Sequence, residues 1–272
     1  MSAPDLAAAL ASGDPATRSK ALSSLAARLR VVEGPVAIDD AVASALLIPL
    51  GSTSRTEQRH TADLVAPLVT VAGALLAALR GALASPDARL RWGAAYALGR
   101  ALPPTRELWP SALETMRLDD GDQRWAAAEL ACRIARNDAT ILAEIRAALA
   151  DPSPTLRKML LYCLRDLKDR GAAEAARSLL SDPDAGVRLA ALAALTAAVD
   201  RAAADPGTAD RVAALLASDA DAGVRRAAAV ALGKLGSAGP DVVAALRAAA
   251  AAGDPSLARA ATGALRALAP PG

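Results

Sequence analysis

The chain has little of the side-chain chemistry on which most active sites depend. Its 272 residues include no Phe, one His and two Cys, and aromatic residues make up only 2%. So few His and Cys exclude most metal centres and any disulfide framework. Cys132 and Cys163 lie in Ala/Leu-rich segments without a CxxC spacing, so we expect two small buried side chains. The sequence therefore predicts no metal site, no cofactor and no catalytic residue.

The chain also has almost no excess of positive over negative charge. The 31 Lys and Arg nearly balance 29 Asp and Glu, which argues against a nucleic-acid partner. The N-terminal stretch lacks a basic start and is a poor signal peptide. The longest uncharged apolar run, 64–79, contains Pro67 and is shorter than the ~18–20 residues that span a membrane. These absences predict a cytoplasmic protein without a membrane partner.

What the chain does contain is a repeat rich in alanine. Alanine makes up roughly a quarter of the residues, far above ordinary usage, and favours closely packed helices. Segments 84–98, 150–164, 181–195 and 218–232 each read as an acidic or Pro-containing turn, an Arg and an Ala/Leu helix. Looser copies lie at 13–25, 119–130 and 253–265. A period of this size indicates a stack of supersecondary units.

Another short apolar helix precedes each turn, so each unit is helix A, a tight turn and helix B. No alternating strand-type pattern recurs. We predict an all-α, right-handed α-solenoid of about eight helix-turn-helix repeats, with residues 201–211 as an extended loop. The expected single solenoid domain, 1–272, comprises an N-terminal repeat (1–36), a degenerate repeat (37–70), regular repeats (71–236) and a C-terminal capping repeat (237–272).

The repeat resembles a known family. The pattern D-P-x-x-x-V-R-x-x-A-x-x-A-L is present at 182–195 and nearly so at 151–164. It resembles HEAT repeats, specifically the short bacterial type related to phycobilin-lyase subunits. The resemblance covers most of the chain and implies the solenoid fold. It implies little about activity, because a fold does not determine function.

The recurrent arginines have a structural and a functional interpretation. They stand at Arg91, Arg124, Arg157, Arg188 and Arg225, on the packed side of helix B. A lone buried Arg is costly, and acidic turns lie beside each one. We therefore predict a ladder of Arg–Asp contacts between neighbouring turns rather than a basic stripe for phosphates. Trp109 and His60 are likewise given structural rather than catalytic roles.

The residues of helices B that lie opposite the buried stripe form a column along successive repeats, and this column predicts a binding site. At ~100° per residue, Trp92, Tyr96, Trp125 and Tyr162 fall on the outward face of three consecutive units. Exposed Trp and Tyr are frequent in recognition hot spots. The alternative is that curvature buries these rings. The predicted partner-binding residues are Trp92, Tyr96, Arg100, Trp125, Glu129, Arg133, Lys158, Tyr162 and Asp166.

The preferred function is a non-enzymatic adaptor that binds a protein or peptide segment on its concave face. In this interpretation Trp92 and Trp125 are the apolar anchors, while Arg100, Arg133 and Lys158 meet carboxylates of the partner. Two enzyme-like alternatives follow from the resemblance. Trp125 and Glu129 are similar to the aromatic–carboxylate pair of HEAT-like DNA glycosylases, and an aromatic groove suits a bilin lyase. The sequence leaves the oligomeric state open.

Overall fold

A computed structural model describes residues 2–31, 38–169, 171–198 and 206–269, and every regular element in these ranges is a helix. The α-helices are α1 (Ala3–Leu10), α2 (Pro15–Val31), α3 (Asp40–Leu50), α4 (Arg55–Val65), α5 (Gly73–Ala82), α6 (Ala88–Ala101), α7 (Trp109–Thr115), α8 (Gly121–Asn137), α9 (Thr140–Ala147), α10 (Pro154–Leu167), α11 (Ala172–Ser178), α12 (Ala185–Ala198), α13 (Pro206–Ser218), α14 (Ala222–Leu235), α15 (Pro240–Ala250) and α16 (Pro255–Leu268). Short 3-10 turns are η1 (Ala66–Leu68), η2 (Arg106–Leu108), η3 (Ala148–Ala150) and η4 (Leu179–Ser181).

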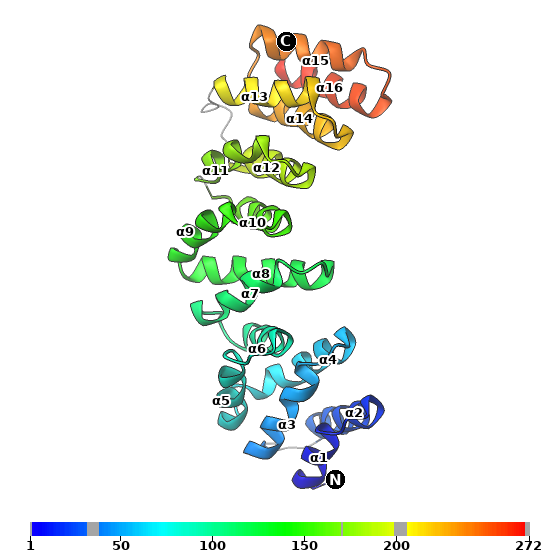
Figure 1. Cartoon of the computed structure of the whole chain (residues 1–272), viewed down its shortest axis with the longest axis vertical. Coiled ribbons are helices and arrows are strands. Elements are labelled where there is room, and N and C mark those ends of the chain that lie inside the picture. Colours follow the sequence, from blue (N-terminus) through cyan, green and yellow to red (C-terminus); the bar gives the residue numbers. More distant parts are fainter. Residues whose placement is uncertain (1, 32–37, 170, 199–205, 270–272) are drawn as a thin grey trace. The chain divides into compact units, whose positions relative to one another are not determined.

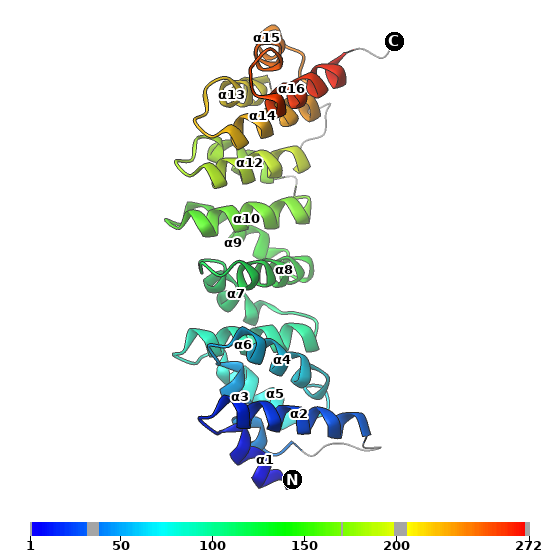
Figure 2. The ribbon, with the colours of Figure 1, turned by 90° about the vertical axis from the view of Figure 1, so that its right-hand side faces the viewer.

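The helices alternate as helix A and helix B of successive repeats (Figures 1 and 2). They fall into two compact units: unit 1 is Met1–Thr115 with Glu129–Asp138, and unit 2 is Met116–Ala128 with Ala139–Gly272. Within unit 2, helices B pack in series, α10 on α12, α12 on α14 and α14 on α16. Within unit 1, α6 packs on α3, α4 and α5. The predicted helix-turn-helix repeats are confirmed, whereas the predicted single domain stays a prediction.

Polar residues before helices B determine where those helices begin. Ser54, Asp87, Ser153, Asp221 and Asp254 each accept a backbone N–H from the first turn of the following helix. Such caps satisfy donors that a helix N-terminus otherwise leaves unpaired. Pro at the first or second helical position reinforces some starts, because it needs no N–H donor there. The short turns of the repeat are therefore encoded locally.

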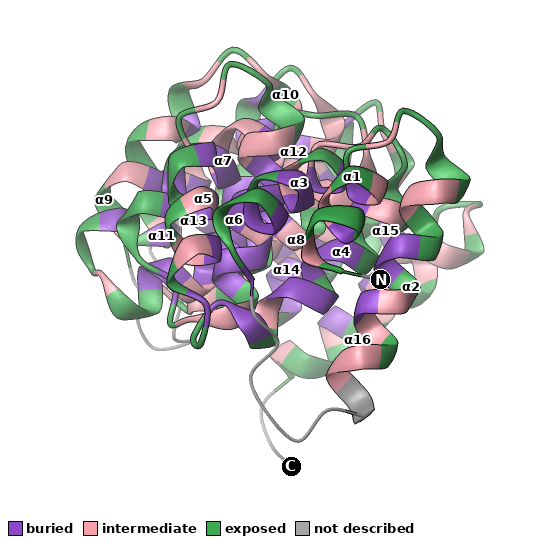
Figure 3. Ribbon diagram, turned by 90° about the horizontal axis from the view of Figure 1, so that it is seen from below, coloured by how far each residue is buried: buried purple, intermediate pink, exposed green. Residues whose placement is uncertain are grey.

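Small residues let the helices approach one another closely, and the buried residues lie where helices face each other (Figure 3). Cys132 and Cys163 are buried, as predicted, and so is Trp109. Gly233 on α14 marks a very close approach, since a Cβ added there would lie 2.9 Å from the Cα of Ala264 on α16. A Cβ on Gly93 of α6 would collide with the Leu50 carbonyl at the end of α3.

The recurrent arginine donates hydrogen bonds to backbone carbonyls of the turn that precedes its own helix. We call it the ladder position, and its counterparts are Arg18, Gln58, Arg91, Arg124, Arg157, Arg188, Arg225 and Ala258. In every repeat that has Arg there, Nη1 donates to the carbonyl of the residue six positions earlier, at 2.6–2.9 Å. We call that residue the turn position. The guanidinium thereby satisfies turn carbonyls that no helix reaches.

Two arginines also bind the acid at the turn position of the next repeat. Arg157 donates from Nε and Nη2 to Asp182 at 2.8 and 2.9 Å, and Arg188 makes the same fork to Asp219 at 2.7 and 2.8 Å. Each Asp also accepts the N–H of the residue two positions on. The side chains of Arg188 and Asp219 are only 14% and 3% exposed. Full hydrogen bonding offsets the cost of burying this ion pair.

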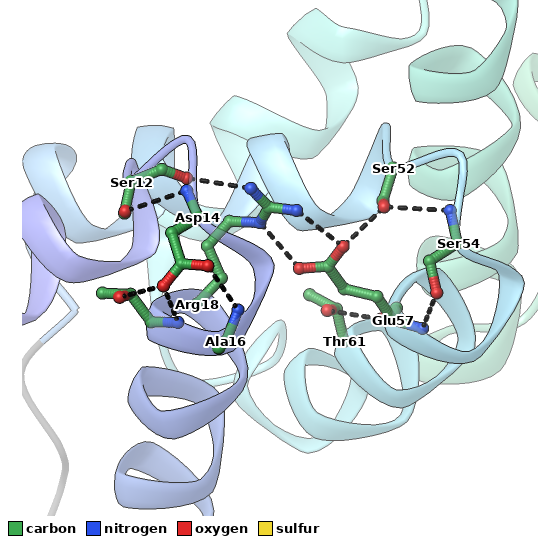
Figure 4. A network of polar contacts seen from close by, with 9 residues as sticks. Ser12, Asp14, Ala16, Arg18, Ser52, Ser54, Glu57 and Thr61 are labelled. Atoms are coloured by element: carbon green, nitrogen blue, oxygen red, sulfur yellow. Dashed lines mark hydrogen bonds and ion pairs between the residues drawn. The ribbon is translucent and has the colours of Figure 1, made fainter.

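The first repeats replace the Asp at the turn position with Ser and recruit another acid. Arg18 donates from Nε and Nη2 to Glu57 at 2.7 and 3.0 Å, and the hydroxyl of Ser52 donates to the same carboxylate (Figure 4). In the degenerate second repeat the ladder position is Gln58. Its buried amide donates to the carbonyls of Leu50 and Arg89. This alignment fixes a register that the sequence left open.

The remaining repeats depart from this pattern of an arginine that binds an Asp of the next turn. Arg91 pairs with Glu114 of α7, at 2.6 Å, instead of an acid in a turn. Asp151 is bound by Arg117 at 2.8 Å, and Nε of Arg124 is buried without a hydrogen-bond partner in the described part of the chain. At the turn position that would serve Arg225 stands Ala252. The predicted Arg–Asp ladder is therefore confirmed for Arg157 and Arg188 and wrong as a rule for every repeat.

Two further expectations change. Residues 206–211 belong to α13 rather than to an extended loop, because Pro206 at the first helical position is compatible with a helix start; residues 199–205 lie outside the described part. His60 is exposed on α4, so it contributes nothing to the core of unit 1.

Gly233→Ala should destabilise unit 2, whereas Gly263→Ala should not. The added Cβ at Gly233 meets backbone of α16, while the space at Gly263 is empty within 4 Å. Overpacking typically costs about 1–3 kcal/mol, whereas removing a glycine from an open helical site stabilises by about 0.5–1 kcal/mol. Urea denaturation of both variants measures this difference. Equal effects of the two substitutions would contradict the close approach of α14 and α16.

Asp219→Asn should destabilise by about 1.5–3 kcal/mol at neutral pH, because Arg188 loses its charged acceptor. Arg188 holds the pKa of Asp219 below the ordinary 3.8, against the opposing effect of burial. The contribution of Asp219 is therefore complete above pH 3.8 and is lost as the pH falls through the lowered pKa. The difference between wild type and variant should shrink in that acid range.

Thermal melts at a series of pH values would measure this effect. Asp166→Asn is the control, because the ion pair of Asp166 with Arg165 is largely exposed and should contribute less than about 1 kcal/mol. A difference between Asp219→Asn and wild type that stays constant down to pH 2 would refute the role given to this ion pair.

Candidate functional site

The predicted aromatic column does not have the uniform exposure expected of it. Trp92 on α6 is only 4% exposed, so its predicted role as an exposed anchor is wrong. The reason is the packing of unit 1: α6 lies against α3, α4 and α5, and Gly93 brings it onto the end of α3. Tyr96 is half-buried beside Trp92, with ring centroids 5.5 Å apart. Trp92 therefore belongs to the core of unit 1, whereas the Tyr96 ring is only partly covered.

The remaining predicted residues of unit 1 offer polar groups. Arg100 lies over the Tyr96 ring, with its Cζ 5.6 Å from the centroid, and pairs with Asp63 at 2.8 Å. Its charge is thus already matched by an acid of α4. On α8, Glu129 is exposed and Arg133 is half-buried. The face of unit 1 therefore lacks the exposed Trp on which the binding prediction depended.

Unit 2 presents the exposed aromatic site. Trp125, in the first part of α8, is 48% exposed. Its ring stacks on that of Tyr162 of α10, with centroids 5.2 Å apart and an interplanar angle of 22°. Arg165 lies one turn after Tyr162, with its Cζ 4.8 Å from the Tyr162 centroid, and its Nε binds Asp166 at 2.8 Å. We call Trp125, Tyr162, Arg165 and Asp166 the aromatic cluster.

Helix geometry explains why these side chains meet. Tyr162 and Arg165 are three residues apart on α10, a spacing that places side chains side by side. Trp125 follows the ladder position of α8, as Lys158 does on α10. The structure therefore brings Trp125, Tyr162 and Asp166 of the predicted set together and places Lys158, half-buried, on the same helix. Sequence reasoning missed Arg165, although its spacing from Tyr162 is a usable signal.

An apolar groove continues from Arg165 across α12 and α14. Its volume is about 430 Å³. The floor consists of small and aliphatic side chains, and the two basic residues of the lining are Arg165 and Lys234. The lining residues are Arg165, Leu189, Leu192, Ala193, Thr196, Ala197, Ala227, Val230, Ala231 and Lys234. Because Arg165 belongs both to the aromatic cluster and to this groove, the two form one continuous surface of unit 2.

The chemistry of this surface comes from aromatic, aliphatic and basic side chains. In the residues that the structure covers, no three His, Cys, Asp or Glu side chains gather in a way that could bind a metal ion. Within those same residues, none of the helices has the length and apolar character needed to cross a bilayer. What the aromatic cluster and the groove offer is stacking, apolar contact and positive charge, which suits binding.

Comparison with known proteins shows which proteins have a similar fold. Residues 177–266 match the HEAT-repeat family, which is less than half of the chain. No curated protein matches. Among solved structures, 98% of the chain aligns with 40% of Kap95p from a structure with RanGDP, at 13% identity and a TM-score of 0.66. The same share of the chain aligns with 92% of the Escherichia coli protein YibA, at 17% identity and a TM-score of 0.57. It also aligns with 79% of an engineered protein, at 22% identity and a TM-score of 0.52.

These similarities show the fold and not a function, because the sequence identities are low. The chain is an all-α solenoid of helical repeats, as predicted. The chain spans less than half the length of Kap95p, whereas it spans most of YibA. HEAT repeats are matched as such, and the phycobilin-lyase type of the repeat stays a prediction.

The three tryptophans should differ in their access to solvent. Trp92 and Trp109 are buried and Trp125 is half exposed. Trp125→Phe should therefore remove most of the acrylamide-quenchable fluorescence, while Trp92→Phe should leave the quenchable part intact. Trp92→Ala should also destabilise by about 3–5 kcal/mol, the usual range for a buried ring. Efficient quenching that survives Trp125→Phe would show that the burial of Trp92 is wrong.

Proposed function

We propose that this protein is a non-enzymatic interaction scaffold that binds a segment of a protein partner on the α8–α14 face of unit 2. The observation that carries the proposal is Trp125, a large ring left 48% exposed although it is stacked on Tyr162. A folded chain gains stability by burying such a ring, and exposed Trp and Tyr commonly form the energetic centre of interfaces. Trp125 and Tyr162 are the anchors in this proposal.

The groove beyond Arg165 provides room for the rest of the segment. Its lining from Leu189 to Val230 is aliphatic and accepts small side chains, while Thr196 offers a hydroxyl. Successive helices B carry this lining, so a bound segment crosses α10, α12 and α14 in turn. Rigid repeats hold the contact residues in place before binding, which reduces the entropy lost on association.

The residues that we propose for this site differ from the residues predicted from the sequence. Trp92 drops out because it is buried, and Arg100 already pairs with Asp63. Glu129 and Arg133 follow Trp125 at successive intervals of four residues on α8, so they extend the same face of that helix. Both belong to unit 1, so they stay a prediction and are not part of the site proposed on unit 2. Lys158, on α10 with Tyr162, adds a positive charge beside the stack.

Substitution of the anchors should abolish capture of a partner. A photo-crosslinking amino acid at the exposed Ala197 on the groove, used in native lysate, should yield protein adducts. Adding Trp125→Ala and Tyr162→Ala should reduce these adducts more than tenfold, because hot-spot residues contribute about 2 kcal/mol or more each. Mass spectrometry of the adducts measures the loss.

Ile48→Ala is the matched control, since Ile48 is an exposed apolar residue of α3 in unit 1. Circular dichroism melts of all variants should stay close to wild type, because the anchors are exposed or half-buried. Adduct yields that the anchor substitutions leave unchanged would refute the proposed scaffold site.

A further inference from the structure

One acid of unit 2 stands at the turn position of its repeat but binds an arginine that is not at a ladder position. Asp151 follows the ladder residue Arg124, and yet its Oδ2 accepts Nη2 of Arg117 at 2.8 Å. Nε of Arg124 is buried and has no hydrogen-bond partner among the residues that the structure describes. All three residues belong to unit 2. A buried N–H without an acceptor is costly, so Arg124 should compete with Arg117 for this acid.

Both ends of the ladder contact between Arg124 and Asp151 are already in place. Nη1 of Arg124 donates to the carbonyl of Leu118 at 2.8 Å, the same turn bond that the other ladder arginines make. Oδ1 of Asp151 accepts the backbone N–H of Ser153 at 2.8 Å, and the acids of the next two turns accept the corresponding N–H at 2.9 and 2.8 Å. The arginine and the acid therefore have the local contacts of pairs that are joined.

The two arginines need the same oxygen atom of Asp151. In the forks of Arg157 and Arg188, Oδ2 of the Asp accepts Nε, while Oδ1 accepts Nη2. At Asp151, Oδ2 is the oxygen that Arg117 occupies. The unpaired atom of Arg124 is Nε, the donor that Oδ2 accepts in the other repeats. The contact made by Arg117 therefore takes the place of the Arg124 fork.

The two possible contacts of Asp151 have opposite advantages. Arg117 donates from Nη2 alone, and the side chains of this pair are 40% and 15% exposed. A fork such as that of Arg157 to Asp182 has two donors, and its side chains are 11% and 4% exposed. Water weakens the first kind of contact, whereas the second kind costs more desolvation. Arg117 is the main reason why the pKa of Asp151 lies below the ordinary 3.8, so the acid is charged at neutral pH.

We propose that Asp151 exchanges between Arg117 and Arg124, so that the junction between the first part of α8 and α10 has an open and a closed state. In the open state, which the structure shows, Arg117 holds the acid and Arg124 binds its own turn. In the closed state Arg124 makes the two-donor fork to Asp151, and Arg117 turns to solvent. This inference does not depend on the proposed function, because the exchange needs no partner.

The exchange lies next to the aromatic cluster. Trp125 directly follows Arg124 in α8, and Tyr162 belongs to α10, which begins just after the turn of Asp151. The Trp125–Tyr162 stack therefore joins the same two helices as the closed fork would. The next two junctions, α10–α12 and α12–α14, have complete forks. Trp125 thus stands beside an ionic contact with two states, whereas the groove across α12 and α14 lies beside fixed ones.

NMR of the arginine side chains in the full chain tests the exchange directly, because hydrogen bonding slows the exchange of an N–H with water. Arg117→Gln removes the competing charge at an exposed residue. The Nε–H of Arg124 should then exchange with water at least about tenfold more slowly than in wild type, since Asp151 becomes its acceptor. Arg124→Gln identifies the signal. The Nε–H of Arg157 is the internal control, because it already binds Asp182 and should keep its rate.

Urea denaturation gives an independent test. Arg117→Gln alone should change the unfolding equilibrium constant by less than about threefold, because Arg124 takes over Asp151, but by more than about tenfold when Arg124→Gln is also present. Arg146→Gln is the matched control, because Arg146 is also 40% exposed and binds an acid, Asp169, that is 9% exposed. Its effect should be the same with and without Arg124→Gln.

Two results would each overturn the exchange. The first is an Nε–H rate of Arg124 that Arg117→Gln leaves unchanged, since the acid would then belong permanently to one arginine. The second is an equal effect of Arg117→Gln in the presence and absence of Arg124→Gln, since the two arginines would then act independently. A slower Nε–H rate together with the larger loss in the Arg124→Gln background supports the two states.

Discussion

The turns of the structure depend on one interaction, the arginine at the ladder position that binds a carbonyl of its own turn and, at Arg157 and Arg188, also the acid of the turn that follows. A guanidinium has five N–H donors in a planar fork, enough to bind two carbonyls of its own turn and a carboxylate of the next. Arg188 uses all three kinds of acceptor, namely the carbonyls of Asp182 and Pro183 and the carboxylate of Asp219. Asp182 in turn accepts Arg157. The same residue type therefore closes a turn and fixes the spacing between repeats.

Where the acid at the turn position is absent, the chain finds other solutions. Ser52 cannot accept Arg18 as a carboxylate would, so Glu57 takes that role and Ser52 donates to Glu57. Gln58 replaces the arginine altogether and uses its amide on two backbone carbonyls. Each substitute pairs buried polar groups in its own way, which shows how the repeat tolerates variation in sequence.

The sequence predicted the repeats well because their determinants are local. Capping residues, the alanine-rich stripe and the arginine recur at a fixed spacing, and each acts within one repeat or on its neighbour. Trp92 could not be predicted in this way. Its position on the wheel is the same as that of Trp125, yet Trp92 is covered where α6 packs on α3, α4 and α5 while Trp125 is open. Exposure depends on neighbours distant in sequence, which helical periodicity does not describe.

The difference between these two tryptophans is also the reason why we propose a binding site on unit 2 and not on unit 1. Trp92 is buried in unit 1, so this ring is not available to a partner. In unit 2, the fork of Arg157 and the fork of Arg188 already join α10, α12 and their turns along the opposite edge of the repeats. The outward side chains of α12 and α14 line the groove beside Arg165, and this is the surface that we propose for binding.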